Sequence, residues 1–142
     1  MTRALLDATV LIAAADTDDA DHEVGIDIVR GVDHGDLPTG VVTNESLLET
    51  LNYVEERLSH ARAVDLLDRF VRGAHFELPY NPKKNYGVSR SLFRESPGLN
   101  FGDCMQTAFM QSREIEYVYS FDDDFDSIDG VTRLNDAVNP YR

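Results

Sequence analysis

Residues 1–16, MTRALLDATVLIAAAD, contain the stretch that decides the fold. Residues 4–6 form a short apolar run of the kind found in buried strands, and more apolar residues follow at once. We therefore predict a buried strand that passes into a helix near Asp7 or Ala8. Asp7 interrupts the apolar run, and burying an ionised carboxylate is costly unless it is paired or binds a metal ion. Asp7 must therefore face solvent or be compensated by a cation.

Similar short apolar segments recur along the chain and alternate with helical patterns. We predict further strands within residues 37–43, 74–80, 116–121 and 131–134, and helices at 24–32, 44–73 (two helices), 81–98 and 100–115. Ser59 is a candidate cap between the two helices of residues 44–73, and Gly73 a candidate stop. This alternation predicts a three-layer α/β/α domain, residues 1–142, with a mostly parallel sheet of four to five strands.

The composition is strongly acidic, with 26 acidic against 13 basic residues and a net charge of −13. The excess of Asp and the shortage of Lys resemble haloarchaeal proteins, in whose molar salt the Debye length falls to about 3 Å and charge repulsion is screened. We therefore attribute the acidity to the solvent. No apolar run approaches the roughly 18 residues that a membrane helix requires, so we expect a cytoplasmic protein with no membrane partner.

The sequence offers few soft metal ligands. Cys104 is the single cysteine, so no intramolecular disulfide is expected, and it has no CxxC companion. The four histidines are scattered and show no HExxH spacing. These patterns argue against a zinc site, and any metal is expected to be a hard one.

Acidic residues are predicted to gather at one edge of the sheet. Asp7 ends the first strand and Asp122 follows the fourth, and the carboxyl ends of parallel strands meet at the same edge. Glu45 and Glu49 are four residues apart on the helix after the second strand, and therefore lie on one helix face. Asp103 lies in the first turn of the helix that precedes the fourth strand. We expect Asp7, Glu49, Asp103 and Asp122 to converge closely enough to share one or two ions.

Each of these acids also has a simpler explanation. Asp103 follows Asn100 by three residues, close to the spacing of a capping box, and Glu45 is an acid in a first helical turn, where negative charge is favourable. Residues 122–124 are three adjacent aspartates that would suit a solvated turn, although a cation would relieve their repulsion. We expect Asp123 to face solvent.

Four segments, taken in order, resemble the PIN-domain family and, within it, the VapC-like toxin ribonucleases. They are DATVLIAAADTDDADH (7–22), VVTNESLLETLNYV (41–54), LNFGDCMQTAFM (99–110) and VYSFDDDFD (118–126). The resemblance covers nearly the whole chain. It implies that Asp7, Glu49, Asp103 and Asp122 are the family's four acids, and that Thr9 and Ser120 are the small polar residues beside the first and the fourth.

The second and fourth acids each have a competitor. Glu45 competes with Glu49, which we prefer because the family glutamate lies farther along the helix and precedes an apolar residue. Glu49 also sits beside Leu48, on a helix face that we expect to be packed, so we predict that it is partly buried. Asp124 could share or replace the role of Asp122.

Clustered carboxylates without soft ligands favour Mg²⁺ or Mn²⁺. With this chemistry, the resemblance implies a metal-dependent endoribonuclease that leaves a 5′-phosphate and a 3′-hydroxyl, the toxin of a type II toxin–antitoxin system with a small antitoxin partner. Asp7 and Asp103 would hold the principal ion, Glu49 would orient or deprotonate water, and Asp122 would complete the site. The alternatives are a PIN-domain nuclease in RNA maturation and a non-catalytic PIN-like binding module.

Two surfaces are candidates for macromolecular contacts. The local basic cluster is the candidate RNA-binding site, although an amphipathic helix with a solvated basic face would show the same pattern: Lys83, Lys84, Arg90 and Arg94, interleaved with Tyr86 and Phe93. The apolar helices around residues 47–54 and 63–71 are candidates for a homodimer interface, as the family resemblance implies.

The compensation expected for Asp7 leads to a stability prediction. If a cation compensates its charge, Asp7→Asn should abolish RNA cleavage and leave the metal-free melting temperature equal or higher, because repulsion among the converging acids is reduced.

Overall fold

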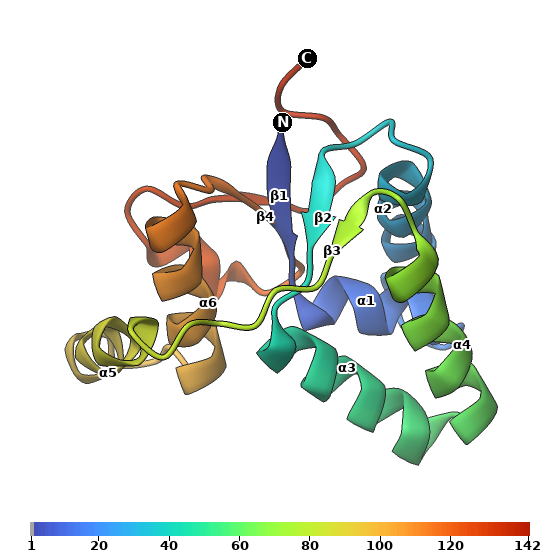
Figure 1. Cartoon of the computed structure of the whole chain (residues 1–142), viewed down its shortest axis with the longest axis horizontal. Helices are drawn as coiled ribbons and strands as arrows, with labels where there is room; N and C mark the ends of the chain where they lie inside the picture. The colour runs from blue at the N-terminus through green and yellow to red at the C-terminus, as the bar shows by residue number, and fades with distance from the viewer. Residues whose placement is uncertain (1) are drawn as a thin grey trace.

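Five parallel strands form the centre of residues 2–142, the part of the chain that the computed structural model describes (Figure 1). The sheet order is β3-β2-β1-β4-β5, and every pairing between neighbours is parallel. The strands are β1 (Arg3–Leu6), β2 (Thr39–Val41), β3 (Phe76–Glu77), β4 (Tyr117–Tyr119) and β5 (Thr132–Leu134). The predicted strand positions and the parallel sheet are confirmed.

Helices cover both faces of this sheet. They are α1 (Ala8–Ala15), α2 (His22–Asp33), α3 (Asn44–Arg57), α4 (His60–Arg72), α5 (Asn85–Glu95) and α6 (Phe101–Arg113), with a 3-10 helix η1 (Asp123–Ser127) after β4. Helices α5 and α6 lie on one side of the sheet and α1, α2 and α4 on the other (Figure 1). The arrangement is the three-layer α/β/α architecture predicted from the alternation of elements.

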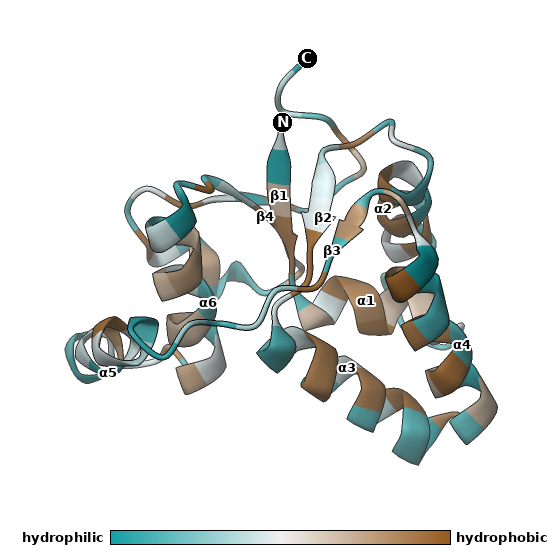
Figure 2. Ribbon diagram, viewed as in Figure 1, coloured by the Kyte–Doolittle hydropathy of each residue, from teal (hydrophilic) through white to brown (hydrophobic). Residues whose placement is uncertain are grey.

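The pleat of β1 divides its side chains between two cores. Ala4 and Leu6 pack with residues of α1, α2 and α4, whereas Leu5 packs with residues of α6 and with Phe125 of η1. Successive side chains of a strand point to opposite faces, and both faces of this sheet are covered, so the strand is apolar at consecutive positions. Figure 2 shows hydrophobic colouring where β1 and β2 approach α1.

Polar side chains fix where the helices begin. The Ser59 hydroxyl accepts a hydrogen bond from the Arg62 N–H (3.2 Å) at the start of α4, as predicted, and α4 ends at Gly73. The Asn100 side-chain oxygen accepts from the Asp103 N–H (2.8 Å) at the start of α6. These caps satisfy backbone donors that would otherwise lack partners, and the second one places Asp103 in the first turn of its helix.

In residues 2–142, no helix has the length and apolar character needed to cross a membrane.

Candidate metal centre

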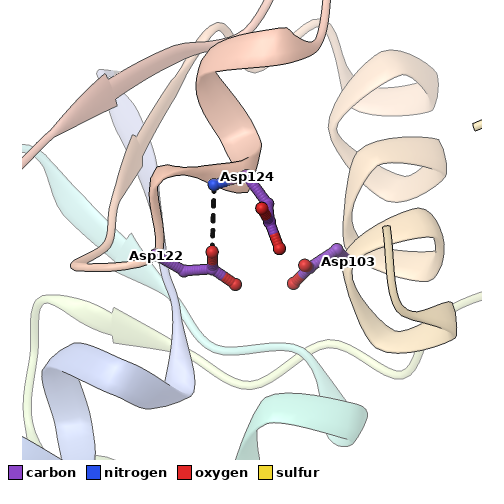
Figure 3. A group of neighbouring side chains, drawn as sticks. All are labelled: Asp103, Asp122 and Asp124. Atoms are coloured by element: carbon purple, nitrogen blue, oxygen red, sulfur yellow. Dashed lines mark hydrogen bonds between the residues drawn. The ribbon is translucent and has the colours of Figure 1, made fainter. Parts of the chain in front are cut away.

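Three carboxyl groups meet beside the carboxyl end of β4. Asp103 comes from the first turn of α6, and Asp122 and Asp124 come from the start of η1; their side chains point toward one another (Figure 3). One oxygen from each group lies within 4.8 Å of the others. Within residues 2–142, this is the one group of three or more His, Cys, Asp or Glu side chains that lie close enough together to hold a metal ion. Asp124, a secondary candidate from the sequence, is therefore a member of the cluster.

Hydrogen bonds in the turn after β4 set the positions of the two η1 aspartates. The Ser120 hydroxyl accepts from the Asp122 N–H (2.9 Å), and Asp122 Oδ1 accepts from the Asp124 N–H (3.0 Å). The carboxylate of Asp122 thus begins the 3-10 helix and brings Asp124 round to the same side as Asp103. Asp123, the residue between them, is exposed as expected.

The surroundings of Asp103 disfavour the ionised form of its carboxyl group. It is buried (4% exposed), and in the part of the chain that the structure describes its Oδ2 atom is buried without a hydrogen-bond partner. Burial, followed by the negative charges of Asp122, Asp7 and Asp124, raises the pKa of its carboxyl group to about 8. A cation at this position would satisfy the free oxygen and remove the repulsion.

Asp7 is compensated differently from the sequence-based expectation. It is buried, and its Oδ2 accepts hydrogen bonds from the Thr9 hydroxyl (2.7 Å) and the Ser120 hydroxyl (2.8 Å). Its Oδ1 accepts from Nε2 of Gln106 (2.9 Å). Three neutral donors therefore stabilise this carboxylate, and it needs no cation to be buried. Thr9 also accepts from the Phe121 N–H (3.0 Å), which ties the turn after β4 to Asp7.

The helix face that carries Leu48 and Glu49 is not packed, contrary to expectation, and only the carboxyl group of Glu49 is partly buried. Leu48 is 63% exposed and Glu49 is exposed as well, because α3 turns its Ser46, Thr50 and Val54 side inward. The pKa of Glu49 is nevertheless raised, first by partial burial of its carboxyl group and then by the charges of Asp7 and Asp122. Its carboxyl group therefore lies within the electrostatic field of the acidic cluster.

Glu45, the competing residue, contacts a different segment. Its Oε1 accepts a hydrogen bond from Nδ2 of Asn81 (2.6 Å), and the same amide donates to the Met105 carbonyl (3.0 Å). Glu45 thus fastens the loop before α5 to α3 and α6.

Sequence reasoning missed Gln106. This residue is buried (3% exposed); it donates to Asp7 from Nε2, and its Oε1 accepts from the Ser46 hydroxyl (2.9 Å). The Ser46 bond fixes the orientation of the amide, so that the donor end faces Asp7. Its spacing of three residues from Asp103, which puts both on one helix face, was the available signal.

Replacement of Gln106 with methionine, which keeps the length of the side chain but donates no hydrogen bond, is expected to destabilise the fold. Asp7 Oδ1 and the Ser46 hydroxyl would each lose a buried partner, at a cost of about 2–3 kcal/mol in the free energy of unfolding. Urea titration measures this directly. Gln111→Met, on the exposed side of the same helix, is the matched control. Equal unfolding midpoints for the two variants would show that the Gln106 hydrogen bonds carry no net stability.

The predicted RNA-binding cations do not enter the acidic cluster. All four are exposed, on α5 or in the loop just before it: Lys83, Lys84, Arg90 and Arg94.

A family model for the PIN domain matches residues 4–131. The chain belongs to the PIN-domain family. The order of the acidic segments had indicated this family, and the match confirms that prediction. No curated protein matches the sequence significantly.

Solved structures with the same PIN fold include several toxin–antitoxin proteins. VapC20 from Mycobacterium tuberculosis, a toxin that cleaves the sarcin–ricin loop, has a TM-score of 0.77 and 20% identity, covering 96% of this chain and 98% of its own. VapBC2 from Rickettsia felis, bound to promoter DNA, has a TM-score of 0.69 and 12% identity (93% and 97% covered). A toxin–antitoxin complex from Klebsiella pneumoniae has a TM-score of 0.64 and 18% identity (91% and 95% covered). These similarities show that the fold extends over nearly the whole chain.

Proposed function

We propose that this PIN domain is a metal-dependent endoribonuclease and the toxin of a toxin–antitoxin system. The observation that carries the proposal is the cluster of Asp103, Asp122 and Asp124, whose oxygens lie within 4.8 Å of one another around a buried Asp103 oxygen that has no partner among the described residues. Like charges at such distances are unfavourable without a counter-ion.

The donor set fits a hard divalent cation. All the ligand atoms are carboxylate oxygens, which suit Mg²⁺ or Mn²⁺, and the free Oδ2 of Asp103 is the atom that such an ion would satisfy. When bound, such an ion makes water a better nucleophile and neutralises charge on the phosphodiester. Asp103, Asp122 and Asp124 would hold it, and Asp7 retains acceptor capacity on Oδ1 for one further contact.

The remaining side chains have separate tasks in this proposal. Glu49, with its raised pKa and exposed position, accepts a proton from the attacking water. Thr9, Ser120 and Gln106 hold the carboxylate of Asp7 in one orientation by their hydrogen bonds. Between Glu45 and Glu49 we assign the catalytic role to Glu49, because Glu45 is engaged with the loop before α5.

The direct test is cleavage of a labelled RNA pool in molar KCl with Mg²⁺, Mn²⁺ or EDTA. We expect the wild type to cleave RNA with either metal and to leave 5′-phosphate ends on the products. No cleavage is expected in EDTA. Asp122→Asn should be at least about 100-fold slower, because a metal ligand is weakened while the bond to the Asp124 N–H can still form. Asp123→Asn, the same change at the exposed neighbour, is the control. Equal rates for the two variants would remove Asp122 from the site, and a wild type inactive with both metals would remove the nuclease function.

We also propose a small antitoxin as partner. The Klebsiella pneumoniae complex and the Rickettsia felis protein bound to promoter DNA support this, since both share the fold over nearly all of this chain. Growth arrest on expression, relieved by a small protein encoded beside this chain, would identify a toxin; harmless expression together with accumulation of uncleaved precursor RNA in a deletion strain would instead identify RNA maturation.

We further propose a homodimer that functions in a salt-rich cytoplasm of haloarchaeal type. The exposed Leu48 of α3 and the exposed Val64 and Val71 of α4 provide apolar area for pairing, and the charge of −13 suits concentrated salt. Light scattering in molar KCl should give twice the chain mass of 15.9 kDa. A single-chain mass at millimolar concentration would contradict pairing.

A further inference from the structure

Exposed aromatic and cationic side chains gather on α5 and in the loop before it. Tyr80 is 80% exposed, and Tyr86 and Phe93 are each 49% exposed, which is unusual for large apolar rings. Together with the neighbouring cations they form what we call the α5 surface: Tyr80, Lys83, Lys84, Tyr86, Arg90 and Phe93.

Helical spacing places the α5 members of this surface on one side of the helix. Tyr86 and Arg90 are four residues apart, and Phe93 follows three residues later. The guanidinium carbon of Arg90 lies 5.3 Å from the centre of the Tyr86 ring, a cation–π contact that holds the two groups together.

The cations of the α5 surface are free to bind a ligand. Within residues 2–142, the ion pairs are formed by Arg3, His60, Arg72 and Arg133, and none of them includes Lys83, Lys84 or Arg90. In a chain with a net charge of −13, a group of unpaired cations stands out as a local site for negative charge.

The α5 surface adjoins the helix that carries Asp103. The rings of Tyr86 and Phe93 both make edge contacts with Phe101, at centroid distances of 5.6 and 5.5 Å, and Phe101 is the first residue of α6. Helices α5 and α6 pack side by side (Figure 1). The rings of Tyr86 and Phe93 thus pack against Phe101, which precedes Asp103 of the metal centre by two positions in the sequence.

A cavity opens on the same side. It has a volume of about 390 Å³ and is lined by Tyr80, Lys83 and Tyr86 of the α5 surface together with Met105 of α6. Its wall is held in place by Asn81, whose backbone N–H donates to Oδ1 of Asn44 (2.7 Å) in addition to the side-chain bonds described above. The site is therefore largely preformed and large enough for a flat aromatic group.

We propose that the α5 surface binds an unpaired segment of RNA next to the cleaved bond. Single-stranded RNA presents free base faces, which stack on aromatic side chains, and phosphates, which pair with Lys and Arg. Tyr80 and Tyr86 stack bases, and Lys83, Lys84 and Arg90 neutralise the phosphates. The inference rests on the proposed function, since it takes RNA as the substrate of the adjoining metal centre.

Charge argues against a second copy of this chain as the occupant. In a symmetric dimer whose two-fold axis passes through this surface, the cations of one α5 surface would face those of the other. A polyanion has the complementary charge.

The test is fluorescence anisotropy with a labelled, unstructured oligoribonucleotide, with Mg²⁺ present and at several KCl concentrations. All the proteins in this assay, including the reference, carry Glu49→Gln, a change at an exposed residue that is expected to prevent cleavage during the measurement. The aromatic pair compared is Tyr80→Ala and Tyr80→Phe. The charge pair is Lys83→Gln with Lys84→Gln, matched by Arg72→Gln with Arg142→Gln, which changes the net charge equally but lies away from α5.

Tyr80→Ala is expected to bind RNA about tenfold more weakly, whereas Tyr80→Phe keeps the stacking face and the wild-type affinity. The lysine pair should reduce the slope of log affinity against log salt by about 1.4, because each lost contact to a single strand contributes about 0.7. The arginine pair should leave the slope unchanged.

The proposal is overturned if Tyr80→Ala binds as tightly as Tyr80→Phe and the lysine pair matches the arginine pair. It is also overturned if these variants lose a dimer in light scattering while keeping their RNA affinity, which would make the α5 surface a self-association site. RNA cleavage by the wild type that persists alongside either result leaves the nuclease function intact. Binding through the α5 surface without any cleavage by the wild type supports an RNA-binding site there, but it removes the nuclease function and with it the position of that site beside a cleaved bond.

Discussion

Asp103→Asn is expected to raise the melting temperature of the metal-free protein by several degrees near pH 8.5 and to abolish metal-dependent cleavage. The wild-type carboxyl group is buried beside Asp7, Asp122 and Asp124, and its pKa is raised to about 8. Asparagine has the same shape but no charge, so it removes the repulsion without opening a cavity. Cleavage should be lost because the amide is a poor ligand for a divalent ion.

The raised pKa of Asp103 makes the stability of the metal-free protein depend on pH. The pKa of Asp103 is 3.8 in the unfolded reference and about 8 in the fold, so between these values the folded protein binds more protons than the unfolded chain. The free energy of unfolding therefore falls as the pH rises through this interval, with the whole loss incurred above about pH 8. Asp103→Asn should flatten the decline, and its advantage should shrink toward pH 4.

Calorimetry in EDTA at constant molar KCl, from about pH 5 to pH 8.5, measures both effects. Asp123→Asn removes one charge from the exposed neighbour and should follow the wild-type curve. If Asp103→Asn melts below the wild type at pH 8.5, the carboxylate stabilises the fold without a metal, and the repulsion inferred here is absent.

Asp7→Asn is expected to act in the opposite direction on stability, lowering the melting temperature by about 10 °C. The carboxylate accepts hydrogen bonds from Thr9, Ser120 and Gln106, and an amide nitrogen placed among these donors leaves at least one of them unsatisfied in a buried position. Cleavage should also be lost, since Asp7 borders the metal centre. The structure thus reverses the stability prediction made from the sequence, in which a cation alone compensated Asp7.

Thermal melting in EDTA near pH 7 distinguishes the two explanations. Asp18→Asn removes the same charge from an exposed position and should leave the melting temperature close to that of the wild type. An Asp7→Asn protein as stable as Asp18→Asn would mean that the three hydrogen bonds contribute nothing and that the original expectation was right.

The strands and helix starts could be predicted because their signals are local. Buried parallel strands appear as short apolar runs, and Ser59 and Asn100 are cap residues that lie directly before amphipathic segments. Asp122 was predicted at the carboxyl edge of the sheet because parallel strands end at one edge, and Asp103 was predicted there because it lies in the first turn of the helix that leads into β4.

Other features of the site depend on rotations that the sequence does not specify. Glu49 is exposed because α3 turns the side with Ser46, Thr50 and Val54 inward. The apolar Leu48 had suggested that its own side of the helix would be packed, but Leu48 is exposed. Asp124 joins the cluster because the chain after Asp122 forms a 3-10 helix, whereas a solvated turn would have left it outside. Gln106 was missed because its three-residue spacing from Asp103 places it on the same helix face but does not show that its amide donates to Asp7.

Equilibrium binding of Mn²⁺ in molar KCl, followed by electron paramagnetic resonance of the free ion, tests the metal centre most directly because it requires no RNA. Saturable binding by the wild type is expected, weakened at least about tenfold in Asp103→Asn and Asp122→Asn, with Asp123→Asn unchanged. A wild type that binds no Mn²⁺, or an Asp103→Asn protein that binds it as tightly as the wild type, would contradict a metal centre at Asp103, Asp122 and Asp124.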